Sequence, residues 1–198
     1  GHTAAAFDSP GADRLYKVTI IPRGHSLGGT HMLPENERHT LPEAYLRLQL
    51  TTLLAGRAAE KLLLGSVSSG ADDDIRRATA MARSMVGRWG MDPEIGPVDL
   101  RESEDHPFLG QQIAQPRTFA DETAARVDQA VMNLLHESEK QAIRLIEEHR
   151  DQVVHLVARL EAEETLDLDA IKSCLEPDST IKPFVTNRKT GHRHIEAD

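Results

Sequence analysis

An apolar residue at every fourth position between residues 46 and 62 is the feature that most restricts the fold. The positions are Leu46, Leu50, Leu54, Ala58 and Leu62. This spacing puts them on one face of an α-helix and predicts that the face is buried. Thr40 and Glu43 are spaced as in a capping box, with Pro42 in the first turn. Gly65 fits a left-handed residue that ends the helix.

Further helices are predicted on both sides of an irregular stretch at residues 91–118. One opens at Asp72 and is expected to end at Gly90. Its apolar stripe is Ile75, Ala78, Ala82, Met85, Val86 and Trp89. A long amphipathic helix is predicted from Asp121 to about Arg150. Its apolar positions are Val127, Val131, Leu134, Leu135, Ala142, Leu145 and Ile146. A helix carrying residues 153–160 is expected to fold back on it as a helical hairpin.

The remaining pattern completes a mainly α fold. Aromatic residues make up only 4% of the chain, so the core must be aliphatic, which suits helices packed on helices. Residues 15–33 contain a β-branched run, turn residues and a short return, which predict a small β-hairpin or sheet near the N-terminus. Residues 97–100 could form one more short strand. A short last helix is predicted near residues 167–175, so we expect one domain over residues 1–175 and a polar, poorly ordered tail over residues 176–198.

Composition excludes several kinds of function. The formal net charge is −9, which argues against a nucleic-acid partner because a basic face is expected there. The single cysteine, Cys174, cannot form an internal disulfide, which fits a reducing compartment. We find no apolar run of the length of a membrane span and no signal peptide, so the chain as printed is expected to be soluble. No phosphate loop of the GxxxxGK[ST] kind occurs, so this chain is not expected to hydrolyse ATP itself.

The aspartates at residues 72–74 are the first candidate site. Acidic side chains at the start of a helix are often there only because they favour its positive end. At about 100° per residue, however, Asp73 points about 170° away from the apolar stripe, and Asp74 lies only about 70° from its centre. Asp74 is therefore expected at the margin of the core, where it needs an Arg, backbone N–H groups or a metal as its partner. His2, just before a short helical stretch, is the candidate co-ligand.

Several stretches together resemble the FtsH family, which comprises membrane-anchored, ATP-dependent zinc metalloproteases of the AAA+ class. They are KVTIIPRG (17–24), LAGRAAEKLLLG (54–65), VSSGADDDIRRATAMAR (67–83), GRWGM (87–91) and GPVDL (96–100). The motifs occur in the family's order and spacing. The resemblance covers residues 1 to about 175 and implies a helical metalloprotease domain.

The resemblance also implies a zinc site. The family's zinc motif is His-Glu-x-Gly-His, in which the two His side chains bind zinc and the Glu acts as general base. Gly1 and His2 match its last two residues, so the first His and the general base are expected upstream of Gly1, and no catalytic residue is expected within the chain. His2 and Asp74 are the implied metal ligands. Glu60, in GRAAEK, is the rival third ligand, and otherwise a residue behind the ligands or an ion-pair partner of Arg57 or Lys61.

The resemblance further implies what surrounds this domain. The parent is expected to have an ATPase module that uses ATP and a transmembrane anchor, both upstream, and to form a homo-hexamer. It would lie in an inner membrane with the peptidase domain on the cytoplasmic side. Substrates would be unfolded or membrane proteins, held as an extended strand against an edge strand formed by THML (30–33) or GPVDL (96–100). With only two of three ligands, the chain as printed is expected to bind zinc weakly and to lack peptidase activity.

Two other readings remain open from the sequence. The chain could belong to a proteolytically dead homologue that serves as a structural or hexamer-forming scaffold. It could also be a metal-free helical binding module with accidental similarity. The residues upstream of Gly1 would separate the protease from the scaffold, because His-Glu-x there favours the protease and its replacement favours the scaffold.

Overall fold

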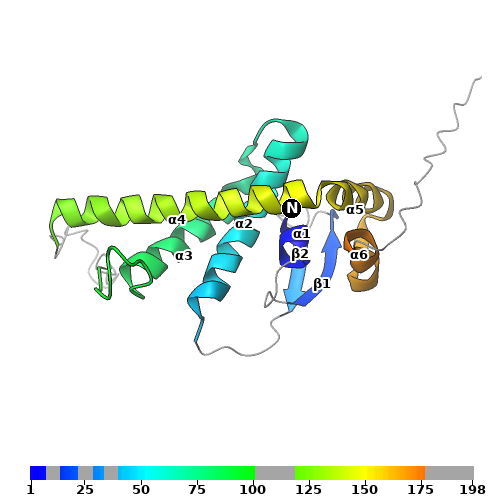
Figure 1. The fold of residues 1–198 in the computed structure, drawn as a ribbon. Helices are drawn as coiled ribbons and strands as arrows, with labels where there is room; N and C mark the ends of the chain where they lie inside the picture. The colour runs from blue at the N-terminus through cyan, green and yellow to red at the C-terminus, as the bar shows by residue number, and fades with distance from the viewer. Residues whose placement is uncertain (8–13, 22–28, 34–39, 101–118, 177–198) are drawn as a thin grey trace, which may run out of the picture.

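The computed structural model describes residues 1–7, 14–21, 29–33, 40–100 and 119–176, and helices dominate them (Figure 1). In chain order the elements are α1 (His2–Phe7), β1 (Arg14–Thr19), β2 (Gly29–Leu33), α2 (Glu43–Leu64), the 3-10 turn η1 (Ser69–Ala71), α3 (Asp72–Gly87), α4 (Asp121–Glu148), α5 (Arg150–Glu163), β3 (Thr165–Asp167) and α6 (Leu168–Leu175). The mainly α fold with a small sheet near the N-terminus, expected from the sequence, is confirmed.

Helix α2 is the centre of the fold and packs against α1, α3 and α4. Leu46, Leu50, Leu54 and Ala58 are buried as their spacing predicts. Leu62, in the last turn, is half-buried. The helix ends at Gly65, which has a φ of 71° and donates its N–H to Lys61 O. This is the predicted left-handed C-cap.

The predicted capping box at the start of α2 is wrong. The helix begins at Glu43, so the N-cap position falls on Pro42, and no side chain caps the helix there. Thr40 therefore stands too far upstream to reach the first free N–H groups. Glu43 instead accepts a hydrogen bond of 2.7 Å from Arg47 Nε, one turn later.

Helices α3 and α4 pack on α2 to form one part of the core. Figure 1 shows α4 lying across both of the other helices. Of the predicted α3 stripe, Ala78, Ala82, Met85 and Val86 are buried, but Ile75 and Trp89 are exposed. The stripe fails at its two ends: Ile75 lies in the first turn of α3, and Trp89 lies beyond its last helical residue.

The sheet has the order β2-β1-β3, and both pairings are antiparallel. The β1–β2 pair confirms the predicted hairpin. Leu15 pairs with Met32 and Lys17 with His31, so Tyr16 is an extra residue that forms a β-bulge. The third strand, β3, comes from residues 165–167 and was not predicted, because three residues carry too little alternation to be recognised.

The strand expected at residues 97–100 is wrong. These residues form no strand, and Leu100 donates its N–H to Gly87 O at 2.7 Å. The segment thus satisfies a carbonyl at the end of α3 instead of extending the sheet. Of the two possible edge strands for a substrate, only the THML segment, within β2, lies in the sheet.

The predicted hairpin between the helices at residues 121–150 and 153–160 also needs correction. Only His149 separates α4 from α5, and one residue is too short a connection to bring two helices back alongside each other. Helix α5 packs instead against α6 and β3. Arg159 on α5 donates to Ser173 Oγ on α6 at 2.7 Å, and Val153 and Leu156 share a core with Ile171.

Other predictions fall on residues that the structure does not describe. These are the turn at 22–28, the irregular stretch at 101–118 and most of the tail, 177–198. In the part of the chain that is described, no helix combines the length and the apolar character that crossing a membrane requires.

Candidate metal centre

His2 opens helix α1, which is held against α2 by small side chains. Ala4, Ala5 and Ala6 are all buried. Ala5 forms a small cluster with Ala55 and Ala58 of α2 and Ala142 of α4. Because alanine side chains let two helix backbones approach closely, this contact fixes where α1 begins and therefore where the His2 side chain can lie.

Asp74 is the one residue of the aspartate triplet that turns inward. The structure places all three in the first turn of α3. Asp72 and Asp73 are exposed, and Asp73 forms an ion pair with Arg76. The side chain of Asp74 is only 24% exposed. The orientation predicted from helical geometry is thus confirmed, and Asp74 is the carboxylate that needs a partner.

That partner is His2, although the two residues lie 72 positions apart in the sequence. His2 Nε2 is 3.0 Å from Asp74 Oδ2. A carboxylate accepts hydrogen bonds, so in this contact Nε2 carries the proton and donates it. This hydrogen bond, opposed by partial burial and aided by the charges of His2 and Arg77, holds the pKa of Asp74 below its ordinary value.

The donor set of this pair fits a zinc ion. Imidazole nitrogen and carboxylate oxygen are both common zinc ligands, at about 2.0–2.2 Å, so two ligands of a tetrahedral site lie about 3.3 Å apart. The 3.0 Å between Nε2 and Oδ2 is close to that spacing. A metal ion between them would replace the shared proton. Among the described residues no group of three or more His, Cys, Asp or Glu side chains could share a metal. As zinc ligands, His2 and Asp74 would be two of the three protein ligands that a catalytic zinc site uses.

Glu60, the rival ligand, has other contacts. Ser68 donates its backbone N–H to Glu60 Oε2 at 3.0 Å. The side-chain and backbone hydrogen bonds from Ser68 are the main cause of the lowered pKa of Glu60. The ion pair considered with Arg57 is replaced by one between Arg57 and Glu139. Glu60 thus ties α2 to the loop that leads into α3, and its role as a ligand stays a prediction.

Three further residues near the pair were missed in the sequence. Gly56 on α2 lies against the imidazole of His2, where a Cβ would come within 2.3 Å of Cε1. Thr3 Oγ1 is 2.9 Å from Thr30 Oγ1, which ties α1 to β2. A glycine inside an otherwise regular apolar helix was the one available signal for Gly56. Nothing in the local sequence connects Thr3 with Thr30.

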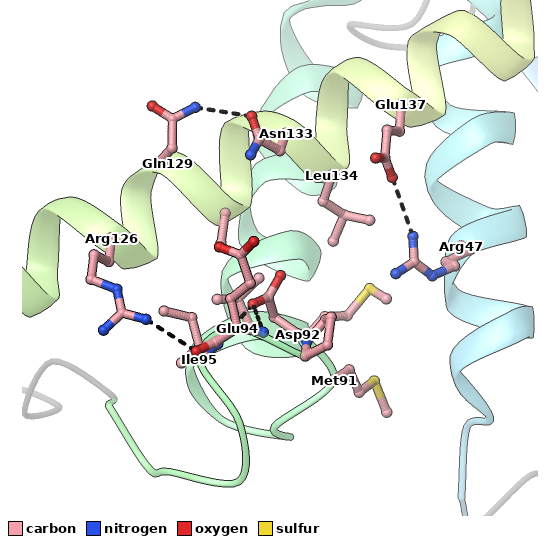
Figure 2. Close-up of a pocket in the computed structure, with 14 residues that line it drawn as sticks. Arg47, Met91, Asp92, Glu94, Ile95, Arg126, Gln129, Asn133, Leu134 and Glu137 are labelled. Atoms are coloured by element: carbon pink, nitrogen blue, oxygen red, sulfur yellow. Dashed lines mark hydrogen bonds and ion pairs between the residues drawn. The ribbon is translucent and has the colours of Figure 1, made fainter.

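The structure also contains a pocket of about 300 Å³ that shares no residue with the pair (Figure 2). It lies between the start of α2, the turn at residues 91–95 and α4, and none of its lining residues is His or Cys. Several of its charged groups have partners, among them Arg47 with Glu137. Asp92 Oδ1 accepts the N–H groups of Glu94 and Ile95, and Arg126 donates to Glu94 O. Among the described residues, the carboxylates of the pocket form no group of three that could hold a metal ion.

Comparison with known proteins agrees with this geometry. The model of peptidase family M41 matches residues 1–174. A protein of Hahella chejuensis named ATP-dependent zinc metalloprotease FtsH is 56% identical over 89% of this chain and 28% of its own length. A protein of Sphaerobacter thermophilus named ATP-dependent zinc metalloprotease FtsH 4 is 46% identical over 88% of this chain and 27% of its own length. The chain thus spans little more than a quarter of the length of these relatives. With a family match over most of its residues, the chain belongs to peptidase family M41.

Proposed function

We propose that this chain is the peptidase part of an ATP-dependent zinc metalloendopeptidase, in which His2 and Asp74 are two of the zinc ligands. The observation that carries the proposal is the 3.0 Å contact between His2 Nε2 and Asp74 Oδ2. Family membership and the names of the relatives support the same activity.

The residues of this chain would hold the metal rather than perform the proton transfer. A bound zinc ion supplies a water with a pKa near 7 and polarises a scissile carbonyl. For zinc binding, His2 must be neutral with Nε2 unprotonated, and its remaining proton then lies on Nδ1. Asp74 must be ionised, which its lowered pKa favours at neutral pH. The third ligand and the general base are expected from His-Glu-x upstream of Gly1.

A protein substrate is proposed to bind as an extended strand along β2. Strand β2 is an edge strand of the sheet. It pairs with β1 along one side, and no strand of the described residues pairs with its other side. Peptides commonly add to such an edge through backbone hydrogen bonds. The Thr3–Thr30 contact ties β2 to the helix that begins with His2, so a strand bound there would run beside the proposed ligands. Backbone pairing would make cleavage tolerant of sequence, as suits the degradation of unfolded or membrane proteins.

The whole protein is proposed to contain more than this domain. The relatives are more than three times as long as their matched part, which leaves room for the ATPase module. By resemblance to the FtsH family we also propose a homo-hexamer, anchored in an inner membrane, with this domain on the cytoplasmic side.

Zinc titration of the chain and its variants tests the proposed ligands. We expect His2→Ala and Asp74→Asn each to weaken zinc binding at least tenfold. His136→Ala on the exposed face of α4 and Asp73→Asn beside the pair are matched controls that should leave it unchanged. Equal zinc affinity of the parent chain and both ligand variants would contradict the proposal.

A cleavage assay separates the protease from the scaffold alternative. The chain extended upstream by the residues of its own parent should cleave casein in a zinc-dependent way, and the chain as printed should not. Failure of the extended chain, with a replacement of His or Glu in the upstream residues, would favour the proteolytically dead scaffold.

A further inference from the structure

We propose that Gly56 is a positioning residue for the proposed metal ligand His2. The missing side chain at position 56 leaves the space in which the imidazole lies with Nε2 toward Asp74. This inference rests on the proposed function, because it concerns how the chain holds one of the two proposed zinc ligands.

The His2 ring lies directly against the Cα of Gly56. A Cβ built on Gly56 would be 2.3 Å from His2 Cε1, 2.9 Å from Nε2 and 3.0 Å from Nδ1. Carbon atoms in contact normally lie 3.5–4.0 Å apart, so any side chain at position 56 would occupy the place of the ring. Nε2, one of these three atoms, is also the atom that contacts Asp74.

Backbone conformation does not explain a glycine here. Within the described part of the chain, the glycines with positive φ are Gly65, Gly90 and Gly96, so Gly56 has a φ that any residue can adopt. Its position is well inside the 22-residue helix α2. A glycine inside a helix costs about 0.5–1 kcal/mol relative to alanine. The remaining reason for a glycine at position 56 is the space that a neighbouring side chain needs, and that side chain is the His2 ring.

The close approach of the two backbones adds to this arrangement. A Cβ on Gly1 would lie 2.0 Å from Ala55 O and 2.8 Å from Gly56 Cα. Helix α1 therefore starts in direct contact with α2, and the His2 side chain has little room to retreat along α1. The ring would have to turn toward solvent, where His2 is already 34% exposed, and away from Asp74.

Substitution at position 56 should thus change the position of the His2 ring without lowering the stability of the metal-free protein. Alanine removes the helix cost of glycine, and the group it displaces is the end of a side chain rather than backbone. We expect Gly56→Ala to keep or raise the melting temperature of the metal-free protein and to move the His2 ring. A residue needed only for packing would show the opposite, with stability falling together with binding.

The test follows the His2 ring by NMR through its Cε1–H resonance, in the parent chain, Gly56→Ala and Gly56→Ser, with and without Zn²⁺. Without metal, both variants should shift this resonance and lose the contact with Asp74. With Zn²⁺, the midpoint of the change at His2 should rise about 10–100-fold, as for other residues that orient a ligand. Gly87→Ala on α3 is the matched control, because a Cβ there would have its nearest neighbour, Leu100 O, at 3.7 Å.

The outcomes are distinct from those of the zinc proposal. If the parent chain does not bind zinc at His2, the proposed function fails, but the metal-free position of the ring still tests Gly56. An unchanged ring position and zinc midpoint in Gly56→Ala would overturn the inference. A melting temperature that falls in Gly56→Ala while the zinc midpoint rises would also overturn it and make Gly56 a packing residue.

Discussion

Arg57 of α2 and Glu139 of α4 form an ion pair between the two longest described helices. Both side chains are largely covered, with 29% and 23% of their surfaces exposed. The pair lies next to the alanine cluster in which Ala55 and Ala58 of α2 meet Ala142 of α4. The ion pair therefore adds a contact with defined geometry beside packing that small alanine side chains provide.

A double-mutant cycle should measure a substantial coupling between these two residues. Arg57→Ala and Glu139→Ala are each expected to lower the free energy of unfolding by about 2 kcal/mol, because each leaves a partly buried charge without its partner. The double variant should lose less than the sum, with a coupling of about 1–2 kcal/mol in urea unfolding. Arg83 and Asp128, which pair at 2.9 Å with both side chains 53% exposed, are the control and should couple by less than about 0.5 kcal/mol. Equal coupling in both pairs would contradict the role of burial.

Glu60→Gln should reduce stability at neutral pH but not in acid. Hydrogen bonds from Ser68 hold the pKa of Glu60 below its ordinary value in the folded state. The contribution of the ionised Glu60 is therefore complete above its unfolded pKa and is lost as the pH falls through the lower folded pKa. Melting temperatures between pH 7 and pH 3 should differ between parent and variant at the neutral end and converge at the acidic end. Glu161→Gln, on an exposed part of α5, is the control. A difference that persists unchanged to pH 3 would contradict a contribution from the ionised carboxylate.

Helical periodicity predicted the parts of the fold that depend on burial along one face. Leu46, Leu50 and Ala58 of α2 and Ala78 of α3 are buried for this reason. The same periodicity failed where the helix ends earlier than the pattern, as at Trp89, which lies beyond the last residue of α3 and is exposed. Burial at such a position depends on where the packed elements end, and no local sequence pattern indicates that.

The candidate site was predicted in part, for a similar reason. The angle of Asp74 on its helix follows from the apolar stripe of α3 alone, and the structure confirms it. Its contact with His2 follows from tertiary packing; the sequence named His2 as a candidate co-ligand, and the family resemblance implied the same pair of ligands. Gly56 and Ser68 act through contacts between elements, and the one sequence signal was the glycine inside an otherwise regular apolar helix at position 56.

Gly65→Ala should destabilise the protein through backbone strain. Gly65 ends α2 with a φ of 71°, and a Cβ there would meet no atom within 4 Å. The cost is thus conformational and is expected to be about 1–2 kcal/mol, the penalty of the left-handed region for a residue with a side chain. Thermal or urea unfolding would measure it. Gly65→Asn should cost less than Gly65→Ala, because asparagine tolerates this conformation better, and the reverse order would contradict the explanation.

Removing one hydroxyl of the Thr3–Thr30 hydrogen bond should cost more stability than removing both. Thr30→Val removes one hydroxyl and leaves Thr3 Oγ1, on a side chain that is almost fully buried, without this partner. We expect it to lower the free energy of unfolding by about 1–2 kcal/mol. The double variant Thr3→Val and Thr30→Val should be more stable than Thr30→Val, because two apolar groups of the same shape then replace both partners. Urea unfolding of the two variants and the parent would measure the order. A double variant less stable than Thr30→Val would mean that Thr3 has a separate partner.

In the upstream-extended chain, Thr30→Val should cleave casein more slowly than the parent, with zinc affinity unchanged. The Thr3–Thr30 contact positions β2 and does not touch the proposed metal, so its loss should affect substrate binding alone.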